Sequence, residues 1–123
     1  MNKYNLDDFI RGWFIGGFKP TIINTTDVEV AIQYFKKGDK EAEHCHKVAT
    51  EITVIVKGRV NISGREFSEG DIIEIEPGEF AKFEAIEDTT TVVVKYPGAL
   101  NDKYLNNLVE CIFKPFNCSI NVF

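Results

Sequence analysis

Two histidines and a carboxylate that lie close together are the residues of this chain best suited to chemistry. His44 and His46 are two positions apart and are the only histidines in the 123 residues, and Glu51 follows shortly after them. Residues two apart on an extended segment project from the same face, so both imidazoles can reach one ion. A nearby carboxylate can complete a mixed nitrogen and oxygen ligand set for a divalent metal. The spacing therefore indicates a metal site at His44, His46 and Glu51.

The three cysteines do not suggest a disulfide framework. Cys45, Cys111 and Cys118 are scattered along the chain and form no C-x-x-C pair. Such a set is typical of free thiols in a reducing compartment. Cys45 stands between the two histidines, but alternation along a strand predicts that its side chain points away from theirs.

Composition and charge indicate one globular domain. Hydrophobic residues make up 44% of the chain and charged residues 27%, and the formal net charge is -5. Because the sequence has no long basic cluster, we expect no nucleic-acid partner. The first residues lack the basic and apolar regions of a signal peptide, and no apolar run approaches the ~20 residues of a membrane helix. We therefore expect a cytoplasmic protein with no membrane partner.

The order of elements predicts an all-β domain with an extension at each end. Short β-branched runs begin at residue 28 and are separated by glycine-containing turns, which favours a sandwich or barrel over alternating βαβ units. The aromatic residues before them are expected to form an arm that packs on the domain. After them, Asp102 is predicted to cap a short helix. The predicted strands are 28–35, 51–56, 59–62, 72–75, 81–85 and 89–96, and the apolar stripe of the helix is Leu105, Leu108, Val109 and Ile112.

The residues around the histidine pair resemble a known family motif. The spacing Gly38-x5-His44-x-His46-x4-Glu51-x6-Gly58 is similar to the first motif of the cupin superfamily at every defined position, and residues 70–78 resemble the start of the second motif. The resemblance implies a small antiparallel β-barrel of the jelly-roll type, or double-stranded β-helix, with a ligand site inside. We therefore expect an arm at 1–27, the barrel at 28–97, and a C-terminal helix and tail at 98–123.

The second motif departs from the family pattern at one position that matters for the metal. Ala81 stands where the family has its metal-binding histidine. The resemblance then leaves His44, His46 and Glu51 as ligands, a set that holds Fe(II) or a similar ion on one side. The expected cofactor is a divalent metal (Fe, Mn, Ni or Zn), bound more weakly than by four ligands. Because the imidazoles must be neutral to bind it, the sequence predicts that affinity falls as the pH drops near ~6.5.

Four further polar residues are candidates for a ligand pocket. Tyr34 and Tyr96 share strand faces with valines and isoleucines, so their hydroxyls can project into a pocket. Thr53 lies on a predicted barrel strand. Glu79 lies in the turn at 77–80, at the rim of the predicted barrel, from where its carboxylate can reach inward.

Two functions from different classes follow from the resemblance. The first is a binding module that holds a small polar metabolite, such as a sugar or nucleotide sugar, inside the barrel, with the metal beside it. The alternative is a metal-dependent enzyme of the sugar isomerase, epimerase or dioxygenase kind, in which substrate oxygens fill the open positions of the ion. A serine or cysteine hydrolase is disfavoured, because both histidines belong to one short segment and leave no independent base.

The apolar residues outside the predicted barrel suggest a partner. Trp13, Phe14 and Phe18 in the arm, together with the stripe of the predicted helix, exceed what a small barrel needs to cover itself. We therefore expect a homodimer. A purely structural role, in which an exposed edge or the helix pairs with another chain, is a third and weaker alternative.

Overall fold

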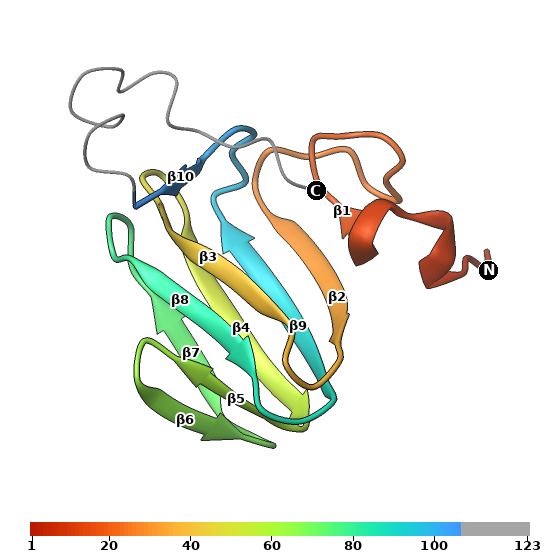
Figure 1. Ribbon diagram of the computed structural model, residues 1–123. Coiled ribbons are helices and arrows are strands. Elements are labelled where there is room, and N and C mark those ends of the chain that lie inside the picture. The colour runs from red at the N-terminus through yellow and green to blue at the C-terminus, as the bar shows by residue number, and fades with distance from the viewer. Residues whose placement is uncertain (107–123) are drawn as a thin grey trace.

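A computed structural model describes residues 1–106 of the chain, and these residues are predominantly β (Figure 1). Two short 3-10 helices come first, followed by strands. The elements are η1 (Leu6–Asp8), η2 (Ile10–Gly12), β1 (Trp13–Ile15), β2 (Glu29–Phe35), β3 (Lys40–His46), β4 (Thr50–Lys57), β5 (Arg59–Ile62), β6 (Arg65–Ser68), β7 (Ile72–Ile75), β8 (Ala81–Ala85), β9 (Thr89–Tyr96) and β10 (Lys103–Leu105). The all-β prediction is confirmed.

Within residues 1–106 the strands form two antiparallel sheets that face each other (Figure 1). The first sheet has the order β1-β2-β9-β4-β7, and the second has the order β10-β3-β8-β5-β6. Strands that follow one another in the chain, such as β2 and β3 or β4 and β5, belong to different sheets. This repeated crossing between two sheets produces the expected jelly-roll arrangement.

The six predicted strands match β2, β4, β5, β7, β8 and β9 closely, but the strands at 40–46 and 65–68 were not predicted. The sequence of β3 is KEAEHCH and that of β6 is REFS. Both are rich in charged residues and poor in β-branched ones, so composition gives little strand signal there. Pairing with neighbouring strands overrides that weak preference: β3 lies between β8 and β10, and β6 pairs with β5.

The space between the sheets is apolar at one end and polar at the other. The apolar end is filled by a cluster of buried residues, with Phe67 and Phe83 packed against it. The ring centroids of Phe83 and Phe35 are 4.6 Å apart. The cluster consists of Ile55, Val60, Ile62, Ile73, Ile75 and Ala81. Near the other end, the pairing of β2 with β9 and of β9 with β4 places Glu29, Lys95 and Glu51 side by side across the first sheet. The polar end is therefore where functional side chains gather.

The N-terminal arm packs on the first sheet through its own short strand. Trp13 begins β1, is 5% exposed, and packs with Ala31, Val93 and Phe18. Gly12 has a φ of +79°, and a Cβ at this position would collide with the carbonyl of Ile32. Glycine therefore permits the arm to approach β2 closely. Trp13 and Phe18 therefore pack against residues of their own chain, and the dimer contact that the sequence suggested stays a prediction.

The predicted start of a C-terminal helix is wrong. Lys103–Leu105 form strand β10, which pairs with β3, and so Leu105 does not begin a helical stripe. The remaining stripe residues, Leu108, Val109 and Ile112, lie outside the described residues. Asp102 does act as a cap, but its carboxylate accepts hydrogen bonds from the loop after β3 rather than from a helix. Within residues 1–106, no helix is long and apolar enough to cross a membrane.

Candidate metal centre

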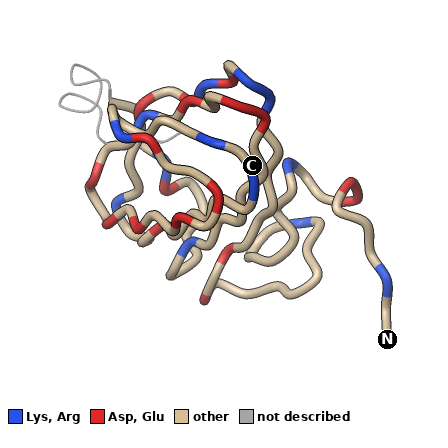
Figure 2. Tube along the Cα trace, turned by 90° about the horizontal axis from the view of Figure 1, so that it is seen from below, with Lys and Arg blue, Asp and Glu red and all other residues tan. Residues whose placement is uncertain are grey.

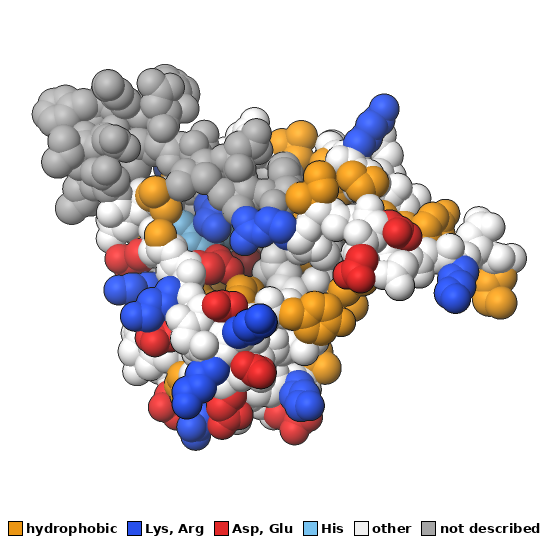
Figure 3. All heavy atoms as spheres, turned by 45° about the vertical axis from the view of Figure 1, so that its right-hand side comes forward, with side chains coloured by type: hydrophobic (Ala, Val, Ile, Leu, Met, Phe, Trp, Pro, Cys, Tyr) orange, Lys and Arg blue, Asp and Glu red, His pale blue; other side chains and the backbone are white. Residues whose placement is uncertain are grey.

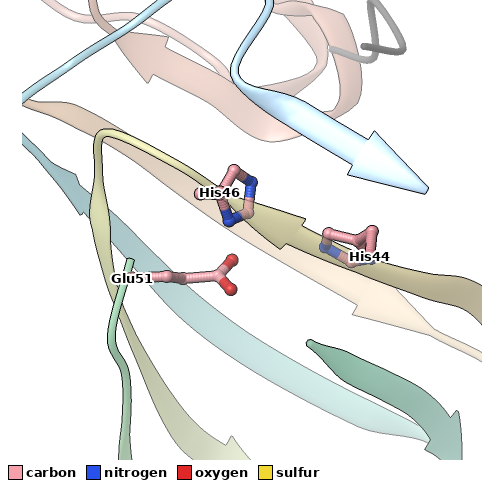
Figure 4. Close-up of side chains that lie close together, drawn as sticks. All are labelled: His44, His46 and Glu51. Atoms are coloured by element: carbon pink, nitrogen blue, oxygen red, sulfur yellow. The ribbon is translucent and has the colours of Figure 1, made fainter. Parts of the chain in front are cut away.

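The three predicted ligands come together from two strands in different sheets. His44 and His46 lie on β3, and Glu51 lies near the start of β4. Their nearest ligand atoms all lie within 4.8 Å of one another, and Figure 4 shows the Glu51 carboxylate directed toward His46. Two ligands at about 2.1 Å from one ion lie at most about 4.2 Å apart, so a small side-chain rotation closes the group around an ion.

The turn between the histidines and the glutamate is held by Asp102. The Asp102 carboxylate, 6% exposed, accepts hydrogen bonds from the amides of Lys47 (3.0 Å), Val48 (3.1 Å) and Ala49 (2.9 Å). A carboxylate that binds three consecutive amides fixes their backbone, because each buried amide needs an acceptor. Asp102 therefore sets the distance between His46 and Glu51. The sequence offered no signal for this contact, since 53 positions separate Asp102 from Ala49.

Hydrogen bonding leaves the Nε2 atom of each histidine available to bind a metal. His44 Nδ1 lies 2.8 Å from the Ala42 carbonyl oxygen. A carbonyl can only accept, so Nδ1 carries the proton and the lone pair of the ring is on Nε2. His46 Nε2 is buried and has no hydrogen-bond partner within residues 1–106. Buried polar atoms are rarely left in this state, and a bound ion is one of the standard explanations.

Burial keeps both imidazoles neutral at neutral pH. It lowers the pKa of His46 to about 3, and the charges of Lys95, His44 and Lys103 act in the same direction. Burial also lowers the pKa of His44, again with a contribution from Lys103. Neutral imidazole is the form that binds a metal. The prediction of metal loss near pH 6.5 therefore moves to lower pH in the folded protein.

The pKa of Glu51 shifts upward, and burial is again the main cause. Burial raises the pKa of its carboxyl, and the positive charge of Lys95 opposes that rise. A bound cation favours the ionised carboxylate in the same way. The donor set of two neutral imidazoles and one carboxylate therefore fits a divalent metal ion.

Lys95 is the main residue of this region that the sequence interpretation missed. It lies on β9 between Glu29 and Glu51, is 9% exposed, and its Nζ atom is 4.7 Å from the centre of the Trp13 ring. Burial lowers the pKa of Lys95 and raises that of Glu29. The sequence did not assign the inward face of β9, because valines occupy both faces of that strand. The lone lysine in this valine-rich run was the available signal.

The structure places only one of the four predicted pocket residues beside the ligand group. Thr53 is 7% exposed and lines a cavity together with His44 and Glu51. Tyr34 and Tyr96 are 69% and 66% exposed and point away from the ligand group, on the outer face of the first sheet. Glu79 is exposed in its turn. Of these four residues, only Thr53 therefore lines a cavity beside the predicted metal ligands.

Ala81 lies beside the ligands, as the resemblance to the second cupin motif implies. It is opposite His44 in the pairing of β3 with β8, is 8% exposed, and lines the same cavity as His44 and Glu51. Its side chain therefore points inward. Cys45, by contrast, is buried but does not belong to the ligand group. Cys111 and Cys118 lie outside the described residues.

Two small cavities of about 40 Å³ each adjoin the ligand group. The first reaches toward the apolar core and includes the Thr91 hydroxyl, which is buried without a hydrogen-bond partner in the described chain. The second has a charged lining: Arg11, Glu41, Glu51, Lys95 and Lys103, with Trp13, Gln33, His44 and His46. Since one water needs about 10–15 Å³, each cavity accepts only a few atoms.

Part of the ligand group is visible at the surface of the protein (Figure 3). Histidine atoms are visible in a hollow of one face, with acidic and basic side chains beside them (Figure 3). Lys and Arg are interspersed with Asp and Glu along the trace (Figure 2). The ion pair between Lys103 and Glu41, 3.5 Å long, is part of the lining of the second cavity.

Comparison with known proteins finds matches in structure only. No family model and no curated protein matches this chain. An uncharacterised conserved protein with a double-stranded β-helix domain from Klebsiella pneumoniae matches with a TM-score of 0.60 and 20% identity, over 78% of this chain and 84% of that one. KdgF from Halomonas sp. matches with a TM-score of 0.56 and 24% identity, over 61% of this chain and 73% of that one.

A third similar structure is described as a sugar phosphate isomerase from a cupin superfamily, from Silicibacter pomeroyi. Its TM-score is 0.58 at 17% identity, and the match covers 66% of this chain and 57% of that one. At these identities the likeness concerns the fold. Together with the two facing sheets, these matches show that the chain has the double-stranded β-helix fold.

Proposed function

We propose that this protein binds a divalent metal ion through His44, His46 and Glu51, and a small polar molecule at the open side of that ion. The observation that carries the proposal is the ligand group itself, whose donor atoms lie within 4.8 Å of one another between the two sheets. Its unpartnered His46 Nε2 supports the same interpretation. The sets of two histidines and one carboxylate that bind Fe(II) leave neighbouring positions open to other ligands.

The size of the interior limits what reaches the ion. Cavities of about 40 Å³ accept a hydroxyl, carbonyl or carboxylate group, whereas the body of a sugar must extend toward the opening. A sugar-like ligand remains compatible with this arrangement if only its polar end enters. The structural neighbours described as KdgF and as a sugar phosphate isomerase support a ligand of that class.

Catalysis at the same site is the second candidate function. It is favoured by the small side chain of Ala81, which leaves open space beside the ligands where the family has a further imidazole. A bound divalent ion supplies Lewis acidity, which polarises a carbonyl or hydroxyl oxygen of a substrate. The chain would contribute three ligands, the largely buried cation of Lys95 and cavities of only about 40 Å³. Turnover of a ligand that binds only with metal would distinguish an enzyme from a binding module.

The proposal is tested by metal titration of protein purified without an affinity tag. We expect one Fe, Mn, Ni or Zn ion per chain, with at least 100-fold weaker affinity in the double variant His44→Ala, His46→Ala and in Glu51→Gln. The matched control is Glu74→Gln, which removes the same charge from an exposed position on a strand beside Glu51. Equal metal affinity in Glu51→Gln, Glu74→Gln and the wild-type protein would refute the proposal.

A further inference from the structure

Lys95 is a buried cation that faces the site without a close polar partner. It is 9% exposed and lines the second cavity together with all three predicted metal ligands. Within residues 1–106 its ammonium group forms no hydrogen bond and no ion pair shorter than 4.0 Å, and its specific contact is with the Trp13 ring. The Glu29 and Glu51 carboxylates attract Lys95 from the neighbouring strands, but neither forms an ion pair with it within 4.0 Å. The ammonium group therefore has room for an acceptor supplied by a ligand in the cavity.

The charges around the cavity leave room for an anion. Glu29 attracts Lys95 from the neighbouring strand without an ion pair within 4.0 Å, and Glu41 pairs with Lys103 at 3.5 Å. Arg11 lines the same cavity from the N-terminal arm and has no ion pair within the described chain. Once Glu51 neutralises half of the charge of a divalent ion, the ion and Arg11 both remain positive. The cavity is therefore electropositive when the metal is bound.

The arm is built to keep Arg11 and Trp13 at this position. Arg11 has a φ of 52°, and Gly12 packs directly on the backbone of β2. Gln33, which also lines the cavity, donates from Nε2 to the Arg11 carbonyl oxygen at 3.5 Å. A left-handed conformation at a residue other than glycine is uncommon and is often found at functional sites. These contacts join the arm to the wall of the cavity.

We propose that the small molecule bound beside the metal is a carboxylic acid, with its carboxylate held between Lys95 and the ion and its remaining atoms directed toward Arg11. This inference rests on the proposed function, because the ion provides one of the two positive groups. A carboxylate has two oxygens on one carbon, so it can meet the ion with one and the ammonium with the other. It also fits the volume of about 40 Å³ better than the larger, tetrahedral phosphate group.

The inference is tested by calorimetry on the metal-loaded protein with three probes: glycolate, its neutral analogue glycolamide, and inorganic phosphate. We expect glycolate to bind at least 10-fold more tightly than either of the others, which is the factor typical of a hydrogen bond to a charged group. Lys95→Met keeps the length of the side chain and removes the charge. In this variant glycolate should bind 10- to 100-fold more weakly, while glycolamide changes by less than threefold.

Two further variants keep the inference testable even if Lys95→Met does not fold. Arg11→Gln changes an exposed residue of the arm and should weaken glycolate binding severalfold. Lys57→Met removes a charge from an exposed position outside the cavity and should leave glycolate binding unchanged. If Lys95→Met does not fold, Arg11→Gln alone decides: unchanged glycolate affinity then counts against the inference.

The possible failures of the inference and of the proposed function are separable. A wild-type protein that binds no metal overturns both. A protein that binds metal but takes up glycolate and glycolamide equally, or neither of them, retains the proposed metal function and loses the carboxylate inference. Tighter binding of phosphate than of glycolate would also overturn the choice of a carboxylate.

Discussion

At the scale of single residues, Ala81 determines how strongly this site can bind a metal. Its side chain points toward His44 and lines the cavity beside Glu51. Ala81→His would add a fourth ligand, and we expect metal affinity to rise by about 10- to 100-fold or more. The cavity beside Ala81, about 40 Å³, accepts only a few atoms, so the added ring should also lower the metal-free unfolding free energy by about 1–3 kcal/mol. Calorimetric metal titration and denaturant unfolding measure the two effects.

The control for this prediction lies on the adjacent position of the same strand. Lys82 is exposed, so Lys82→His places an imidazole on the opposite face of β8. Metal affinity should then stay at the wild-type value. An equal gain from Lys82→His and Ala81→His would mean that the added imidazole acts outside the predicted centre.

The histidine pKa shifts predict how the stability of the metal-free protein depends on pH. The pKa of His46 is about 3 when folded, and an unfolded histidine titrates near 6.5. Between these values the unfolded chain binds more protons, so the unfolding free energy falls by about 1.4 kcal/mol per pH unit as the pH drops below 6.5. His44 acts in the same direction, whereas the raised pKa values of Glu29 and Glu51 act in the opposite one.

Comparison with His46→Gln isolates the contribution of one histidine. Denaturant unfolding of both proteins should show that the difference between them changes with pH from 6.5 down to 5.0, and stays constant above pH 7.5. A difference that is independent of pH across this range would contradict the assigned burial of His46.

At the scale of elements, the contact between Asp102 and the turn after β3 is the feature that positions the ligands. Asp102→Ala would leave the part-buried amides of Lys47 and Val48 and the buried amide of Ala49 without their acceptor. We expect a loss of about 1–3 kcal/mol or more in unfolding free energy, because unsatisfied buried donors are costly. We also expect metal affinity to fall at least 10-fold, since the turn joins His46 to Glu51.

Asp102→Asn provides the informative comparison, because it keeps one acceptor oxygen. It should recover part of the stability and of the metal affinity that Asp102→Ala loses. Thermal unfolding and metal titration of the two variants are the measurements. Wild-type metal affinity in Asp102→Ala would show that the turn does not position the ligands.

The sequence could predict the elements whose signals are local. Strand composition and turn glycines predicted β2, β4, β5, β7, β8 and β9, and the motif around His44 predicted the ligand group. Contacts that join distant segments could not be predicted in this way. The apolar residues after Asp102 have helix-like spacing. The segment Lys103–Leu105 nevertheless forms a strand, because it pairs with β3. Local pattern and long-range pairing conflict there, and the pairing decides the structure.

The orientation of the strands in the first sheet was also beyond the sequence. In β9, valines occupy both faces, so alternation alone does not indicate which face is interior. The register resolves this: Ala31, Val93 and Thr53 lie in one inward row, while Ile32, Val92 and Val54 lie in an outward row. This explains why Tyr34 and Tyr96 face outward and why Lys95 was missed.

At the scale of the whole molecule, the outer face of the first sheet is apolar and extends across four strands. Ile72 and Tyr34 on this face are 67% and 69% exposed. Two cross-strand rows form its centre: Val30, Val94 and Ile52 in one, and Ile32, Val92, Val54 and Ile72 in the other. Exposed apolar patches of this kind mark interaction sites, and a flat sheet face can pair with a second copy of itself about a twofold axis.

We therefore still expect a homodimer, now on the basis of this sheet face rather than of the arm. Ile72→Lys should shift the protein toward the monomer in sedimentation equilibrium, because two charges would meet across a twofold interface. Ile22→Lys, at a 40% exposed position before β2, should leave the association unchanged. A wild-type protein that remains monomeric at all concentrations would contradict this expectation.

The central claim is that one divalent ion sits between the two sheets on His44, His46 and Glu51. Crystals of the metal-loaded protein, measured at the absorption edge of the bound metal, test it most directly. We predict a single anomalous peak at about 2.0–2.2 Å from His44 Nε2, His46 Nε2 and a Glu51 carboxylate oxygen. A peak at any other group of residues, or no peak between the sheets, would contradict the account.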